Sequence, residues 1–140
     1  MKLHLPVLLV TALVSLSGCQ TNSMNQVMET SVSQVQTRQM QTRAFDTTDK
    51  KKTLRTVIAT LQDLGFVIDK ADNELGSVSG TKLDGYSLRM TVTVRPKGKK
   101  QTSVRANATY NVTPVEDPQP YQQFFVALEK AMFLTAHEVD

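Results

Sequence analysis

Cysteine and tryptophan are almost missing from this chain: of 140 residues one is Cys, Cys19, and none is Trp. A single cysteine cannot close an internal disulfide or supply a cysteine-cluster metal site. Histidine is nearly as scarce, with His4 and His137 alone. The length fits one domain, and a hydrophobic content of 40% is too high for a wholly disordered chain.

Long hydrophobic runs are also missing. The apolar run Leu5–Leu16 covers 12 residues, well short of the ~20 that a membrane-spanning helix requires. Lys2 precedes the run, and the small residues Ser17 and Gly18 follow it. A basic start, a short apolar core and small residues are typical of an export signal, which we expect at residues 1–18. The alternative is a buried N-terminal helix, which the abrupt end at Ser17 and Gly18 disfavours.

The four residues Leu16-Ser17-Gly18-Cys19 resemble the lipobox of bacterial lipoproteins: a branched apolar residue, two small residues and cysteine. The resemblance implies that the peptidase recognises Leu16, Ser17 and Gly18, and that Cys19 carries the lipid and becomes the first residue of the mature chain. Acyl chains contribute ~0.8 kcal/mol per buried CH₂, so several of them make a permanent anchor. The resemblance also implies the outer membrane, because Gln20 stands where an inner-membrane retention signal has Asp.

The charge balance of the mature chain excludes an electrostatic nucleic-acid footprint. The whole chain has 16 basic and 13 acidic side chains, and removing residues 1–18 takes away one basic residue, Lys2, so the net charge falls from +3 to +2. Nucleic-acid binding needs a larger basic excess. We therefore expect no nucleic-acid partner, no cofactor and no metal.

A polar segment separates the anchor from the domain. Residues 20–37 are rich in Gln, Ser, Thr and Asn and contain a single charge, Glu29, so we expect residues 19–37 to form a flexible tether. Its 18 residues after Cys19 reach roughly 25 Å. Met28, Val32 and Val35 have helical spacing, so a marginal helix or a partner-docking segment is the alternative.

Residues 38–140 are predicted to form one α+β domain of order β-α-β-β-β-β-α. Apolar residues at helical spacing predict helices over 48–64 and 118–136. Alternating residues predict strands over 38–45, 66–71, 77–83, 86–95 and 102–112, with Val112 on the covered face. One-sided alternation favours an antiparallel sheet of four to five strands with both helices on one face.

Catalysis is disfavoured by the residue inventory. Cys19 is used by the lipid, and His137 is the single histidine of the mature chain, so no nucleophilic triad or metal-ligand spacing can be assembled. Carboxylates could act as acid and base, and the candidates are Asp63, Asp69, Asp72, Glu74 and Asp84. Except for Asp69, they lie at predicted helix ends or turns, where solvated carboxylates are expected. We expect a protein that is not an enzyme.

Basic side chains form the candidate contact sites. Lys50, Lys51 and Lys52 fall in the first turn of a predicted helix, where positive charge opposes the helix dipole. Three further lysines lie on a predicted hairpin: Lys97, Lys99 and Lys100. Three arginines lie on the polar face of the predicted sheet: Arg89, Arg95 and Arg105. These side chains either solubilise the protein or contact a partner or lipid headgroups.

Residues 53–81 combine a helix, Gly65-Phe66, a strand, an acidic turn with Gly76 and a second strand. This unit resembles the helix-grip domains of the accessory lipoprotein of the outer-membrane barrel-assembly machine. The resemblance implies a periplasm-facing domain that binds a protein partner in an assembly, transport or efflux system. The alternative is a carrier of a hydrophobic ligand, held between the last helix and the sheet by Phe124, Phe125, Met132 and Phe133.

Cys19→Ala tests the anchor. We expect this variant to accumulate as an unprocessed precursor that lacks lipid, because no other thiol can accept the lipid. Detergent phase partitioning and the mass of the intact protein measure the change. Unaltered partitioning and processing would rule out the lipobox.

Overall fold

The computed structural model of the chain describes residues 33–83 and 87–137. The chain divides into two compact units, Met1–Val35 and Gln36–Asp140, and the sheet and its covering helices belong to the second. Cys19 and the residues before it lie outside the described residues, as does most of the expected tether.

The protein is an α+β fold built on an antiparallel sheet, as the sequence predicts. The strands are β1 (Thr42–Phe45), β2 (Val67–Asp72), β3 (Ser77–Leu83), β4 (Ser87–Lys97), β5 (Gln101–Tyr110) and β6 (Thr113–Pro114). They pair in the order β1-β5-β4-β3-β2, with β6 beside β5. A helix at 33–41, α2 (Lys50–Asp63) and α3 (Gln119–His137) complete the described chain, so the predicted counts of strands and helices are both too low.

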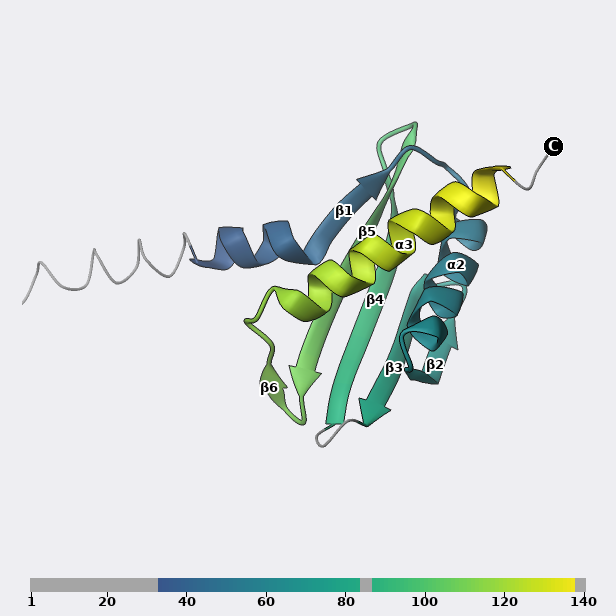
Figure 1. Cartoon of the computed structure of the whole chain (residues 1–140). Coiled ribbons are helices and arrows are strands. Elements are labelled where there is room, and N and C mark those ends of the chain that lie inside the picture. The colour runs from purple at the N-terminus through teal and green to yellow at the C-terminus, as the bar shows by residue number, and fades with distance from the viewer. Residues whose placement is uncertain (1–32, 84–86, 138–140) are drawn as a thin grey trace, which may run out of the picture. The chain divides into compact units, whose positions relative to one another are not determined.

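Both α2 and α3 lie on the same face of the sheet (Figure 1). Leu54, Val57 and Leu61 of α2 are at most 1% exposed. They join Tyr121, Phe124, Phe125 and Leu128 of α3 in one core with the apolar side chains of β3, β4 and β5: Val78, Met90, Val92, Val94, Val104, Ala106 and Ala108. Burying the Leu, Val, Phe and Met side chains of this core stabilises the fold by about 1.5–3 kcal/mol each.

Local signals fix the ends of α2. The carboxylate of Asp49 accepts a hydrogen bond from the Lys52 amide at 2.9 Å, which caps the first turn. Gly65, with φ +87°, follows the last turn in a left-handed conformation that favours glycine. Three buried threonines of α2, Thr53, Thr56 and Thr60, donate their hydroxyls to the carbonyl four residues back, which pairs all three hydroxyls.

Two sequence predictions are wrong at the strand ends. Residues 38–41 are helical and only Thr42–Phe45 form a strand, because the Gln41 side chain is buried and the Arg43 guanidinium bonds the carbonyl of Gln39. Val112 is 90% exposed, because Asn111 adopts φ +54° and turns the chain back into β6 before β5 can continue.

The sheet has an irregular edge at β2. The register shifts between Ile68 and Lys70, so Asp69 has no cross-strand partner in β3. Such a bulge increases twist and interrupts the ladder. The Asp69 carboxylate instead accepts a hydrogen bond from the Thr81 hydroxyl at 2.6 Å.

The hydroxyl of Tyr121 closes a gap along β5. Strand β1 pairs with Thr102–Arg105 and β6 pairs with Thr109 and Tyr110. The Ala108 amide, which lies between these two stretches, donates to the Tyr121 hydroxyl at 3.2 Å. The same hydroxyl donates to the Val115 carbonyl at 2.9 Å and accepts from Gln41 Nε2 at 3.3 Å. One buried oxygen therefore joins β5, α3, the β6 segment and the residue before β1.

Tyr121→Phe should lower the free energy of unfolding by about 1–3 kcal/mol, because the Ala108 amide would be left buried without an acceptor. Urea denaturation measures this loss. Gln41→Met is the control and should lower the free energy of unfolding by less, because the Tyr121 hydroxyl keeps its bonds to Ala108 and Val115. Equal midpoints for Tyr121→Phe and the parent would contradict the role of the hydroxyl.

Candidate functional site

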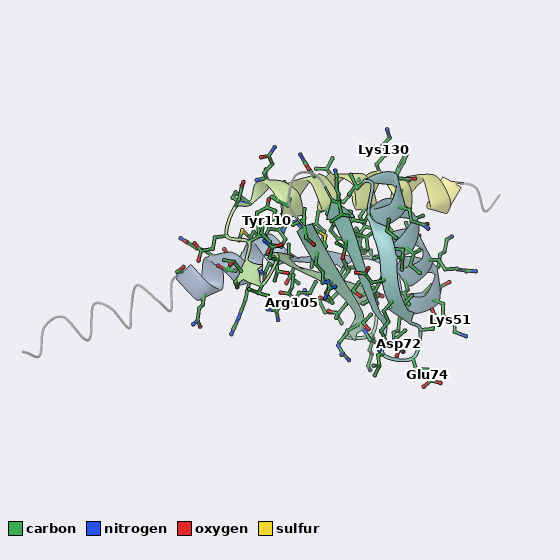
Figure 2. The ribbon with its side chains drawn as sticks, turned by 90° about the horizontal axis from the view of Figure 1, so that it is seen from below. Lys51, Asp72, Glu74, Arg105, Tyr110 and Lys130 are labelled. Carbon is green, nitrogen blue, oxygen red and sulfur yellow. The ribbon has the colours of Figure 1, made fainter. Side chains whose placement is uncertain are left out.

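The face of the sheet opposite the helices carries polar side chains in cross-strand rows. Residues paired across antiparallel strands point to the same face, and three rows cross β3, β4 and β5: Thr81–Arg89–Thr109, Ser79–Thr91–Asn107 and Ser77–Thr93–Arg105. A shorter row adds Arg95 and Ser103. We call these eleven residues the open face. Arg105 projects from the side of the sheet away from α3 and its Lys130 in Figure 2.

The structure gives Arg89 an intramolecular partner. Arg89 Nε lies 3.7 Å from Asp69 Oδ2, and Thr81 stands between the two charges. The two charged side chains are 60% and 36% exposed, so the pair contributes at most about 1 kcal/mol. Its main effect is to neutralise one of the three arginines that the sequence identified.

Arg95 and Arg105 lie diagonally across β4 and β5. Arg95 pairs with Ser103 and Arg105 pairs with Thr93, so the two arginines and the two hydroxyl residues form the corners of one square. Diagonal neighbours of this kind are about 7–8 Å apart. Both arginines are exposed. Arg105 reaches one neighbour, Gln41 Oε1, at 3.5 Å, the outer limit of a hydrogen bond.

The square combines two permanent positive charges with two hydroxyl donors. Like charges placed close together on one face destabilise a sheet locally, and a bound carboxylate would relieve that repulsion. A guanidinium binds carboxylates through two parallel hydrogen bonds, and hydroxyls supply further donors. The arrangement therefore fits an acidic side chain of a partner.

The two lysine clusters, 45 residues apart in sequence, lie at the same end of the sheet. Lys97 pairs with Gln101 at the β4–β5 hairpin, at the top of Figure 1. The segment before α2 reaches that hairpin, because Gln101 Nε2 donates to Asp46 and the Thr102 hydroxyl donates to the Thr47 carbonyl, at 2.7 and 2.6 Å. We call the six lysines at this end the lysine end: Lys50, Lys51, Lys52, Lys97, Lys99 and Lys100.

One member of the lysine end has a structural role. Lys50 Nζ donates to the Glu74 carbonyl at 2.9 Å, and its side chain crosses Gly76. Gly76 has φ +66°, and its carbonyl accepts from the Val94 amide at 2.8 Å. The ammonium group of Lys50 thus holds the β2–β3 turn against the start of α2.

The side chains expected to surround a hydrophobic ligand are occupied in packing or exposed. Phe124 and Phe125 are 0% and 2% exposed, and their ring centroids are 5.1 Å apart. The Arg43 guanidinium lies 5.1 Å from the Phe125 centroid, and Phe133 is 63% exposed. An open groove of about 300 Å³ between α2 and α3 is lined by other residues: Lys52, Arg55, Thr56, Ala59 and Ala131.

Among residues 33–83 and 87–137 no three His, Cys, Asp or Glu side chains are grouped as metal ligands would be. The candidate carboxylates lie on different elements: Asp63 ends α2, Asp69 lies at the β2 bulge, and Asp72 and Glu74 lie at the β2–β3 turn, where the Asp72 carboxylate accepts from the Leu75 amide. Asp84 and Cys19 lie outside the described residues. In the part of the chain that the structure describes, no helix is long and apolar enough to cross a membrane.

Comparison with known proteins leaves the family open. No protein-family model matches the chain, and no curated protein matches it.

The sequence reasoning missed four of the eleven residues of the open face. Ser77, Ser79 and Thr81 of β3, together with Ser103 of β5, complete the rows that the arginines begin. The signal was present, because Val78 and Gly80 alternate with these hydroxyl residues and are buried. The contact between Asp69 and Arg89 had no sequence signal, because it depends on the register shift in β2.

Gly76→Ala and Gly98→Ala form a matched pair that tests the packing around Gly76, to which Lys50 and the Val94 carbonyl both contribute. Both glycines have positive φ, +66° and +61°, so both variants carry the strain of the left-handed conformation, about 1–2 kcal/mol. A Cβ at Gly76 would also lie 2.5 Å from Lys50 Cε and from the Val94 carbonyl oxygen, whereas one at Gly98 meets nothing within 4 Å.

We therefore expect Gly76→Ala to lower the free energy of unfolding by about 1–3 kcal/mol more than Gly98→Ala. Parallel urea titrations of the two variants give the difference. Equal losses would show that the turn moves aside and that the packing around Gly76 does not restrain it.

Proposed function

We propose that this chain is a lipid-anchored, non-enzymatic lipoprotein of the bacterial envelope whose domain binds a protein partner through its open face. The lipid is attached at Cys19, and the domain faces the periplasm from the outer membrane. The partner belongs to an envelope system for assembly, transport or efflux. The observation that carries the proposal is the square of Arg95, Arg105, Thr93 and Ser103 on a face that neither α2 nor α3 covers.

The one-sided packing supports a docking role for the open face. Three alternating side chains of β4, Met90, Val92 and Val94, are at most 1% exposed beneath the helices. The other side of the same strand presents Arg89, Thr91, Thr93 and Arg95. The core is thus complete without the open face, whose side chains are available to a partner.

The chemistry of the open face favours an acidic protein segment as the partner. Of its arginines, Arg89 has a carboxylate beside it, whereas Arg95 and Arg105 are exposed without an acidic residue across the β4–β5 pairing. A partner that places a carboxylate over the square gains charge-assisted hydrogen bonds that are about twice as strong as neutral ones.

The lipobox-like residues 16–19 support the anchor and the compartment. They begin at Leu16, the last residue of the short apolar run Leu5–Leu16. The Asp72 carboxylate is engaged by the Leu75 amide and the aromatic core is packed, which supports binding in preference to catalysis.

A photoreactive residue at Thr93 in living cells tests the proposal. We expect it to crosslink one defined envelope protein, because Thr93 lies at a corner of the square. The same photoreactive residue at Glu129, exposed on α3, is the matched control and should not recover that protein. Mass spectrometry of the crosslinked product identifies the partner.

The charge dependence of the crosslink provides the decisive comparison. Arg95→Glu with Arg105→Glu should lower its yield about tenfold or more, because removing charged contacts costs about 2–5 kcal/mol. Arg55→Glu with Lys130→Glu makes the same change of charge on the helix side and should leave the yield unchanged. Equal crosslink yields from Thr93 and Glu129 would refute the docking role. A crosslink yield that does not change when the open-face charges are reversed would refute it as well. Thermal melting confirms that each variant is folded.

A further inference from the structure

The lysine end gathers positive charge, and four of its lysines, at the start of α2 and on the hairpin, lie at the surface. Lys51, Lys97, Lys99 and Lys100 are exposed. No acidic residue occupies the first turn of α2, where carboxylates are stabilising and lysines oppose the helix dipole. The hairpin lysines flank Gly98, where an added Cβ would meet nothing within 4 Å. Positive charge is therefore placed where local structure gains nothing from it.

The carboxylates near this end are largely engaged with their own backbone. Asp49 accepts from the Lys52 amide and Asp72 from the Leu75 amide, at 2.9 and 2.8 Å, and Asp46 accepts from the Gln101 side chain. Glu74 completes the set. Figure 2 shows Lys51, Asp72 and Glu74 close together at one side of the domain. Six lysines against these four carboxylates leave the end net positive.

An apolar side chain projects from the same end. Leu75 is 60% exposed at the tip of the β2–β3 turn. The Lys50 ammonium bonds the carbonyl of the preceding residue, Glu74, so the turn that carries Leu75 is held beside Lys50. Basic side chains around an exposed apolar one are typical of surfaces that rest on anionic bilayers.

The length of chain after the proposed lipid brings this end within reach of a bilayer. A flexible chain as long as the stretch from Cys19 to Ser33 spans roughly 20 Å. Electrostatic attraction to headgroups acts over about 10 Å at moderate salt. A domain tethered at this distance therefore samples contact with the headgroups continually.

We propose that the lysine end rests on the anionic phospholipid headgroups of the membrane that holds the lipid anchor, and so orients the domain. The headgroup phosphates contact Lys51, Lys97, Lys99 and Lys100, and Leu75 enters the interface. Strands β4 and β5, which carry Arg95 and Arg105, lead away from the hairpin. When the hairpin rests on the headgroups, the open face is therefore roughly perpendicular to the bilayer plane. The orientation rests on the lipid anchor of the proposed function but not on the identity of the protein partner.

The absence of tryptophan allows single-tryptophan reporters at the two ends of the domain. Leu75→Trp places a reporter at the lysine end. Val112→Trp, at a site 90% exposed in the turn at the other end of β5, is the matched control. Each full-length lipidated protein is reconstituted into phosphatidylcholine vesicles with brominated acyl chains, with or without phosphatidylglycerol, and tryptophan quenching is measured.

We expect strong quenching of the Leu75→Trp reporter in phosphatidylglycerol vesicles and little quenching of the Val112→Trp reporter. Quenching at Leu75→Trp should fall in pure phosphatidylcholine, and also when salt is raised from about 0.1 M to about 1 M, because the screening length drops to about 3 Å. Lys97→Gln, Lys99→Gln and Lys100→Gln together should lower the contact equilibrium about tenfold or more, since each lysine near an anionic surface is worth about fivefold.

A matched triple variant controls for net charge. Lys70→Gln, Lys82→Gln and Lys130→Gln remove the same charge outside the lysine end and should leave the quenching of Leu75→Trp unchanged. Equal quenching of the two reporters, indifference to lipid charge, or equal effects of the two triple variants would overturn the orientation. Vesicle flotation, measured first, reports the anchor separately: protein that does not float refutes the anchor, whereas floating protein with unquenched Leu75→Trp refutes only the orientation.

Discussion

The hydroxyl of Tyr121 holds together segments that come from opposite ends of the domain sequence. Strand β5 has too few partners on its outer edge, because β1 and β6 each cover only part of it. A single phenolic oxygen between them satisfies the Ala108 amide and the Val115 carbonyl and receives Gln41. The position of α3 over the sheet, the end of the helix at 33–41 and the start of β1 all depend on that contact. The tyrosine ring supplies apolar area to the core at the same time, since Tyr121 is 1% exposed.

Covering one face of the sheet defines what the other face can do. With α2 and α3 both on one side, the buried apolar residues of β3, β4 and β5 are fully used in the core. The side chains on the opposite face are not part of the core, so their chemical types can suit the binding of a partner. Hydroxyls and guanidinium groups at these positions bind polar segments, and they also keep a bare sheet soluble.

The sequence predicted the layers of the fold well because they follow from periodicity. The alternation in residues 87–97 and the helical spacing of Leu54, Val57 and Leu61 each point to a buried face, and burial in the structure agrees. The helix end at Gly65 was also predictable from local sequence, because glycine readily adopts the left-handed conformation that the residue after the helix requires. The class, the antiparallel sheet and the covering by two helices needed no long-range information.

The errors and omissions concern contacts between distant residues. Nothing local in Gln41 shows that its amide will meet Tyr121, 80 positions away. The end of β5 at Tyr110 depends on the positive φ of Asn111, which turns the chain back so that β6 returns along the edge. For the site, the arginines could be named individually, whereas the square that Arg95 and Arg105 form required the register of β4 against β5. The convergence of the two lysine clusters likewise came only with the folded topology.

The register shift in β2 has a consequence for self-association. Strand β2 is an outer strand of the sheet, and an outer strand with regular, unpaired amides would invite a neighbouring copy to continue the ladder. The irregularity between Ile68 and Lys70 breaks the even spacing of donors and acceptors, and Asp69 adds a charge at the break. The bulged, charged border of the sheet therefore disfavours edge-to-edge association between copies of the chain.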